Sequence, residues 1–159
     1  MNNFNIDKIT DGLGKPIDPL IKKSVTRFNV AGFETVGSCE GHLAWASPAP
    51  YVDIRYSSNI DYAKKYSRLK TLVDKFNKAH KITPPLELRL GKIVDSGTNG
   101  GAIRIASLIH EPGSRVLNSR GYYENVLPDK SKSVFGIPRS IYLKEAQKIM
   151  DKFTEELEG

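Results

Sequence analysis

The first clear pattern of apolar positions covers residues 18–32 and has helical spacing. Three apolar residues occur at positions i, i+4 and i+7, so they share one face of a predicted helix. Asp18 can cap that helix by accepting hydrogen bonds from unpaired backbone N–H groups, and Pro19 suits the first helical position. Gly32 suits the left-handed residue that often follows a helix. The apolar face consists of Ile21, Val25 and Phe28.

Two longer patterns predict further helices over about residues 59–80 and 139–157. The sequence Thr-Pro-Pro at residues 83–85 ends the first of them, because proline lacks the backbone N–H that a helix interior requires. The buried face of the first comprises Tyr62, Tyr66, Leu69, Val73 and Phe76. The buried face of the second comprises Tyr142, Ala146, Ile149, Met150, Phe153 and Leu157.

Alternating polar and apolar residues predict four strands. The clearest is YVDIRY (residues 51–56), in which Val52, Ile54 and Tyr56 share one face. The segment SGTNGG (96–101) is rich in residues that tolerate positive φ, and it predicts a hairpin between the last two strands. The other strands are FETVGS (33–38), LELRL (86–90) and AIRIASLI (102–109).

The order of these elements predicts an α+β fold in a single domain spanning residues 1–159. Two helix-strand-strand units are followed by a C-terminal helix, and the helices pack on one face of a mixed or antiparallel sheet. Residues 110–138 form a long segment with little periodicity, which is either a functional loop or a connection. The sheet face opposite the helices carries charged residues that either pair across strands or form a polar binding face under that segment. They are Asp53, Arg55, Glu87, Arg89 and Arg104.

Composition is that of an ordinary globular protein, with 39% hydrophobic and 26% charged residues in a chain of 159. The single cysteine excludes an internal disulfide, which suits a reducing compartment. The N-terminus is polar and lacks the apolar core of a signal peptide, and no apolar run approaches the roughly 20 residues of a membrane-spanning helix. These features predict a soluble, cytoplasmic protein without a membrane partner.

The net charge of +6 favours polyanionic partners such as nucleic acid or nucleotides. The lysines are spread along the chain, so they serve solubility equally well. A nucleic-acid surface would combine arginines with the tandem tyrosines of the segment SRGYYENV (119–126), whose rings would stack on bases. The alternative is that these tyrosines anchor a long loop to the core. The candidate nucleic-acid contacts are Arg89, Arg104, Arg115, Arg120, Tyr122 and Tyr123.

Candidate chemistry concentrates in TVGSCEGHLAW (35–45), which contains the only cysteine and the only tryptophan of the chain. One hypothesis is nucleophilic catalysis, with a Cys39 thiolate activated by His42 and oriented by Glu40. Glu40 and His42 are also the acid–base pair of a second possible reaction class. Against both, side chains adjacent in sequence rarely converge, and a thiol can equally be a small buried apolar group.

The same stretch contains C-x-x-H, which is half of a zinc pattern. A structural zinc site needs four ligands, and the only other histidines are His80 and His110. We therefore assign no metal ligands from the sequence.

A further hypothesis is a small-molecule or phosphate site at the same loop. Backbone N–H groups around Gly37, Ser38 and Gly41 could form an anion-binding nest, and Trp45 offers a stacking surface. The alternative is a packed turn in which Trp45 completes the core. Further polar groups for such a site are Asp53 and Arg55.

The stretch NVAGFETVGSCEGH (29–42), followed by Pro-Tyr-Val at 50–52, resembles a group of uncharacterised bacterial and phage proteins that carry an SCEGH motif before a YI or YV strand. More distantly, it resembles the tRNA wybutosine-synthesis methyltransferase family, in which a helix ending in Leu-Asn and a strand with Thr precede Ser-Ser-Cys-Ser-Gly-Arg. The resemblance covers about residues 18–56.

The second resemblance implies a loop, with Ser38, Cys39 and Gly41, that binds S-adenosylmethionine and a modified guanosine of tRNA. Gly37, Glu40 and His42 depart from that family's motif. Replacing its arginine by histidine removes bidentate recognition of a carboxylate or phosphate. The resemblance therefore implies a shared local fold and site position more than a shared reaction.

The sequence as a whole predicts a small basic protein with a ligand site, or an RNA- or nucleotide-related site, at the SCEGH loop, with methyltransferase-like RNA modification as one reaction. The alternative is a non-enzymatic nucleic-acid-binding module or a phage-type factor that binds a protein partner. Three structural features distinguish these functions. An enzyme or small-ligand site requires a cavity at the loop, and a nucleic-acid-binding module requires a continuous positive face. A factor that binds a protein partner requires an exposed apolar patch. Glycine-rich dinucleotide and phosphate-loop motifs are missing from the sequence.

Overall fold

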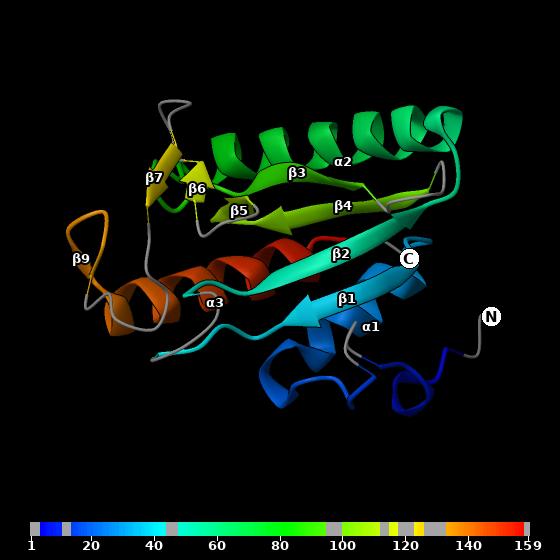
Figure 1. Cartoon of the computed structure of the whole chain (residues 1–159), viewed down its shortest axis with the longest axis horizontal. Coiled ribbons are helices and arrows are strands. Elements are labelled where there is room, and N and C mark those ends of the chain that lie inside the picture. The colour runs from blue at the N-terminus through cyan, green and yellow to red at the C-terminus, as the bar shows by residue number, and fades with distance from the viewer. Residues whose placement is uncertain are drawn as a thin grey trace.

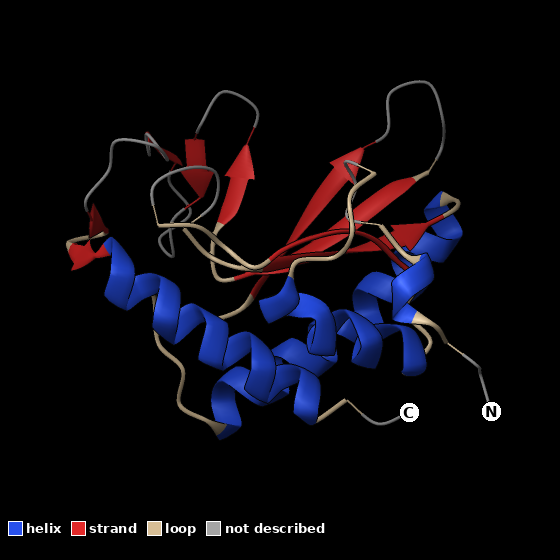
Figure 2. Cartoon of the chain, turned by 90° about the horizontal axis from the view of Figure 1, so that it is seen from below, coloured by secondary structure: helices blue, strands red, loops and turns tan. Residues whose placement is uncertain are grey.

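Helices cover one face of a four-stranded antiparallel sheet, and smaller sheets lie at its other side and end (Figures 1 and 2). The computed structural model describes residues 4–10, 14–43, 48–94, 100–111, 115–117, 123–125 and 133–157. This arrangement confirms the predicted α+β class and the packing of the helices on a single face.

Three α-helices occur in the described residues, and each follows the apolar spacing that predicted it. They are α1 (Lys22–Val30), α2 (Asn59–Ala79) and α3 (Arg139–Glu155). Two short 3-10 helices, η1 (Ile6–Lys8) and η2 (Pro19–Ile21), precede α1. The Ser58 hydroxyl caps α2 by accepting from the Asp61 N–H at 3.1 Å. Each helix thus lies within a few residues of its predicted range.

The main sheet has the strand order β1-β2-β4-β3, and every pair is antiparallel. The strand predicted at residues 51–56 is confirmed as β2. The strand predicted at 86–90 is wrong in position, because β3 starts only at Arg89. Asn77 of α2 holds both backbone groups of Leu88 at 3.0 and 3.1 Å, so this residue bonds to a helix side chain and not to a neighbouring strand. The strands are β1 (Thr35–Cys39), β2 (Tyr51–Tyr56), β3 (Arg89–Val94) and β4 (Gly101–Ala106).

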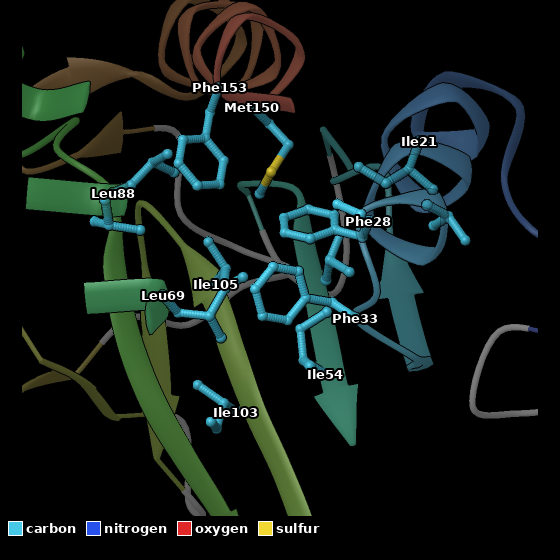
Figure 3. Packing of buried hydrophobic residues seen from close by; sticks show 14 of the residues in the cluster. Ile21, Phe28, Phe33, Ile54, Leu69, Leu88, Ile103, Ile105, Met150 and Phe153 are labelled. Atoms are coloured by element: carbon cyan, nitrogen blue, oxygen red, sulfur yellow. The ribbon is translucent and has the colours of Figure 1, made fainter. Parts of the chain in front are cut away.

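The core lies between this sheet and the helices (Figure 3). Phe28 of α1 packs against Phe33 and Phe153, with ring centroids 6.3 and 6.0 Å apart, and Phe76 of α2 meets Phe153 at 5.3 Å. Burial of each such side chain contributes roughly 1.5–3 kcal/mol relative to exposure. The strands contribute Val52, Ile54, Ile103 and Ile105 to the same cluster.

Short strands occur in the segment predicted to be irregular. β5 (Ile109–Glu111), β6 (Arg115–Leu117) and β7 (Tyr123–Asn125) form a three-stranded sheet on the side of the main sheet away from the helices (Figure 2). Ile109 packs against Gly91, where an added Cβ would lie only 2.6 Å from its methyl group. β8 (Ser133–Val134) and β9 (Ile137–Pro138) form a hairpin that leads directly into α3.

A second, smaller cluster of buried apolar side chains fastens the start of α3 to the loop that precedes β2. Its hydroxyl-bearing member, Tyr142, donates to the Pro85 carbonyl at 2.8 Å. The cluster fixes α3 beside the SCEGH loop. Its members are Ala49, Leu108, Val134, Tyr142 and Ala146.

No helix in the described ranges is both long enough and apolar enough to cross a bilayer.

Candidate functional site

The SCEGH loop leaves the end of β1 and is tied first to the segment around η2. The Glu40 carboxylate accepts from the Leu20 N–H at 2.9 Å, and the Glu40 N–H donates to the Asp18 carboxylate at 3.3 Å. These reciprocal bonds join residues 20 and 22 positions apart in sequence. They also engage the Glu40 carboxylate with the Leu20 N–H.

The other side of the loop is tied to α3. Gln147 donates to the Glu40 carbonyl at 2.9 Å, and the Arg139 guanidinium donates to the His42 carbonyl at 3.0 Å. Gly41, between them, has φ +85°, and a Cβ there would overlap Leu143. The loop backbone is therefore held in one conformation by both neighbouring elements, and only glycine fits its tightest point.

Asp18, Cys39 and His42 converge at this position. One ligand-type atom from each lies within 4.8 Å of those of the other two. Cys39 is buried at 7% exposure, whereas Asp18 and His42 are half-buried. Cys39 and His42 come together, and the third member of the group is Asp18 and not Glu40.

Asp18 was predicted to cap the first helix, and that prediction is wrong. The residue stands at the N-cap position of η2, but its side chain makes no capping hydrogen bond. Its carboxylate turns instead toward the loop and accepts from Glu40. Nothing in local sequence distinguishes the two roles, because an aspartate before a proline is typical of a helix start.

Burial raises the pKa of the Cys39 thiol above its ordinary value, and the carboxylates of Asp18 and Glu40 raise it further. A hydrogen bond from the Gly41 N–H to Sγ at 3.4 Å and the charge of Arg104 act in the opposite direction. The protein alone therefore favours the neutral thiol. An activated cysteine nucleophile requires the reverse, a lowered pKa.

Next to Cys39, the sheet face away from the helices carries a largely buried ion pair. Arg104 donates to both carboxylate oxygens of Asp53 at 2.8 and 3.0 Å, and its guanidinium stacks 3.7 Å from the centre of the Tyr51 ring. Gly37 makes room for this pair, since a Cβ there would lie 2.9 Å from Asp53. The pair satisfies two charges that would otherwise be buried alone.

Other charged residues named from the sequence are placed apart from the loop. Arg55 is exposed and lies 3.8 Å from Glu34, and Arg89 contacts Glu87 at 3.1 Å. With Arg104 held by Asp53, the arginines on this face each have a carboxylate partner. They are cross-strand or local ion pairs, as one of the two sequence-based interpretations held.

Ser38 lies on the opposite side of β1 from Cys39, because it pairs with the core residue Val52. Its hydroxyl is buried without a hydrogen-bond partner among the described residues. Arg115 and Tyr123 fall in β6 and β7. Trp45, Arg120 and Tyr122 lie outside the described residues.

A pocket of about 630 Å³ opens between the loop and the first turns of α3. We call it the loop–helix pocket. Three of its lining residues are large, apolar and exposed, namely Leu20 at 63%, Leu43 at 60% and Ile141 at 54%. Gly41 and His42 connect the pocket to the Asp18–Cys39–His42 group. The remaining lining residues are Ser140, Leu143, Lys144 and Gln147.

No protein-family model matches the chain, and no curated protein or solved structure is significantly similar to it. The resemblance of residues 18–56 to SCEGH proteins and to the wybutosine-synthesis methyltransferases thus stays a prediction. What the site can bind follows from its own residues.

Proposed function

We propose that the protein binds a small organic anion with an apolar body in the loop–helix pocket. Nucleotides, with a planar base and a phosphate, belong to this class. The observation that carries the proposal is the pocket itself, in which exposed apolar walls and the cationic Lys144 lie beside the SCEGH loop.

The walls favour an apolar body. Leu20, Leu43 and Ile141 are each more than half exposed, although such side chains are normally buried. Covering them would remove apolar surface from water at roughly 25 cal/mol per Å². A volume of about 630 Å³ lies within the usual range for small-molecule sites.

The α3 side of the pocket favours an anionic group. Ser140 stands in the first turn of the 17-residue helix α3, whose N-terminus carries partial positive charge. Lys144 follows one turn later and lines the same pocket. Together, a helix N-terminus and a lysine are a suitable setting for a phosphate or carboxylate.

This proposal is more specific than the prediction from the sequence, which was a ligand site or an RNA- or nucleotide-related site at the SCEGH loop. The arginines offered as nucleic-acid contacts at positions 89 and 104 are held by carboxylates, which supports a pocket over an extended basic face. Methyl transfer needs mainly correct positioning of donor and acceptor, so S-adenosylmethionine belongs among the ligands to be tested.

The test is calorimetric titration and thermal unfolding with adenosine monophosphate, octanoate, S-adenosylmethionine and a short RNA. A ligand at about one hundred times its Kd stabilises the folded state by roughly 2.7 kcal/mol. We expect Lys144→Ala to weaken binding of the anionic ligand by about ten-fold, which corresponds to about 1.4 kcal/mol.

Lys148→Ala is the matched control, because Lys148 lies one turn further along α3, pairs with Glu145 at 3.3 Å and does not line the pocket. The control should bind like wild type. Equal losses in both variants, or no small-molecule binding at all, would contradict the proposal. Binding of RNA alone would favour the nucleic-acid alternative.

A further inference from the structure

We propose that Asp18, Cys39 and His42 bind a zinc ion at the base of the SCEGH loop. The metal site itself does not depend on what the loop–helix pocket binds. It follows from a juxtaposition of three ligand types that the fold brings together from two segments of the chain.

The spacing of the three groups suits a single metal ion. In a tetrahedral zinc site, typical bond lengths place neighbouring ligand atoms about 3.3–3.6 Å apart. The present atoms lie within 4.8 Å of one another, so side-chain movements of roughly an ångström would close the site around an ion. Because Asp18 and His42 are only half-buried, rotamer changes can supply those movements.

The donor set selects the metal. A thiolate is a poor ligand for magnesium or calcium, which bind through oxygen atoms. Sulfur, imidazole nitrogen and carboxylate oxygen together suit zinc, which accepts all three. On binding, the Cys39 S–H bond is replaced by a sulfur–zinc bond, and the proton leaves to solvent.

Backbone groups around the site are arranged as outer contacts of a metal centre. The Gly41 N–H donates to the Cys39 sulfur, and the Glu40 N–H donates to the Asp18 carboxylate. Such bonds orient ligands and stabilise their charged forms. Gln147 and Arg139 in turn donate to the loop carbonyls at positions 40 and 42, so the backbone that carries the two loop ligands is held in place before any metal arrives.

Three protein ligands leave a coordination position available, as in catalytic zinc sites and unlike closed structural ones. His42 lines the loop–helix pocket as well as the three-residue group. The acidic group of a pocket ligand, or a water molecule, can therefore reach the metal. This last step rests on the proposed function, whereas the metal site does not.

The experiment is titration of the metal-free protein, without a histidine tag, by Zn²⁺ in a calorimeter and by Co²⁺ in a spectrophotometer. We expect one ion per chain and a near-ultraviolet band from the cobalt–thiolate bond. Cys39→Ser should abolish that band, and Asp18→Asn and His42→Gln should each weaken binding by about ten-fold or more.

His80→Gln serves as the matched control, because it removes a histidine that contacts Glu156 far from the loop. It should bind metal like wild type. Circular dichroism checks the fold of each variant, and Asp18→Asn decides the matter if Cys39→Ser does not fold.

Absence of one-to-one binding, or binding that survives Cys39→Ser and Asp18→Asn, would overturn the metal site. The titration is run without any pocket ligand, so its failure leaves the pocket proposal standing. Conversely, metal binding by a protein that binds no small anion would support the metal site alone.

Discussion

The helix-facing side of the main sheet and the SCEGH loop at its end are stabilised in different ways. On the helix side, side chains from all three α-helices and from β2 and β4 interlock, and large groups such as Phe28 and Ile54 are 0% exposed. At the loop, a few hydrogen bonds from η2 and α3 hold the backbone, and large apolar side chains remain exposed. Burial of apolar side chains from many elements determines the fold, whereas a few individual hydrogen bonds determine the conformation of the loop.

The largest expected effect is in the core. Phe28→Ala should lower the free energy of unfolding by about 3–5 kcal/mol, because it removes contacts with two other rings and leaves a cavity. Leu43→Ala, in the loop–helix pocket, should change it by less than about 0.5 kcal/mol. Urea denaturation measures both. Similar losses of unfolding free energy in the two variants would contradict the proposed difference between the core and the loop.

An intermediate effect is expected at the buried ion pair beside Cys39. Arg104→Met leaves the Asp53 carboxylate buried at 8% exposure without its bidentate partner, and should cost about 2–3 kcal/mol. The double variant with Asp53→Asn should recover part of that loss, because the uncompensated charge is gone. A double-mutant cycle in urea measures the coupling. Additive losses would show that the pair contributes no coupling energy.

The smallest effect concerns Asp61, at the start of α2. The Ser57 N–H, at 2.9 Å, and Lys65 lower the pKa of its carboxyl group. A lowered pKa in the folded state means that the ionised form stabilises the fold. That contribution is present above the unfolded value of about 3.9 and disappears as pH falls through the lower folded value.

Asp61→Asn should accordingly be less stable than wild type at pH 7. The two proteins should be equally stable at a pH below the folded pKa of Asp61, where the wild-type carboxyl group is protonated. The measurement is the difference between the two urea midpoints as a function of pH. A difference that stays constant with pH would assign the effect to Asn at this position and not to the charge. Cys39→Ala is a suitable reference, because Cys39 takes no part in the Ser57–Asp61–Lys65 contacts. Its effect on the urea midpoint should not follow the titration of Asp61.

The sequence by itself determined the helices and the strand at 51–56. Helix and strand periodicities are local features of the sequence. An element that buries one face must place its apolar residues on that face, whatever its position in the fold. The SCEGH loop was identified because its residue types are scarce elsewhere in the chain, and in the structure ligand-type atoms of Cys39 and His42 lie within 4.8 Å of each other.

Tertiary structure decided which partners those residues have. Asp18 is indistinguishable from a helix cap until η2 packs against the loop, and Glu40 is a plausible catalytic carboxylate until it bonds to Leu20. β3 begins later than predicted for the same reason. Asn77 of α2 is hydrogen-bonded to both backbone groups of Leu88, so this residue does not pair with a neighbouring strand. Contacts between segments distant in sequence carry no local periodicity, so only the folded chain reveals them.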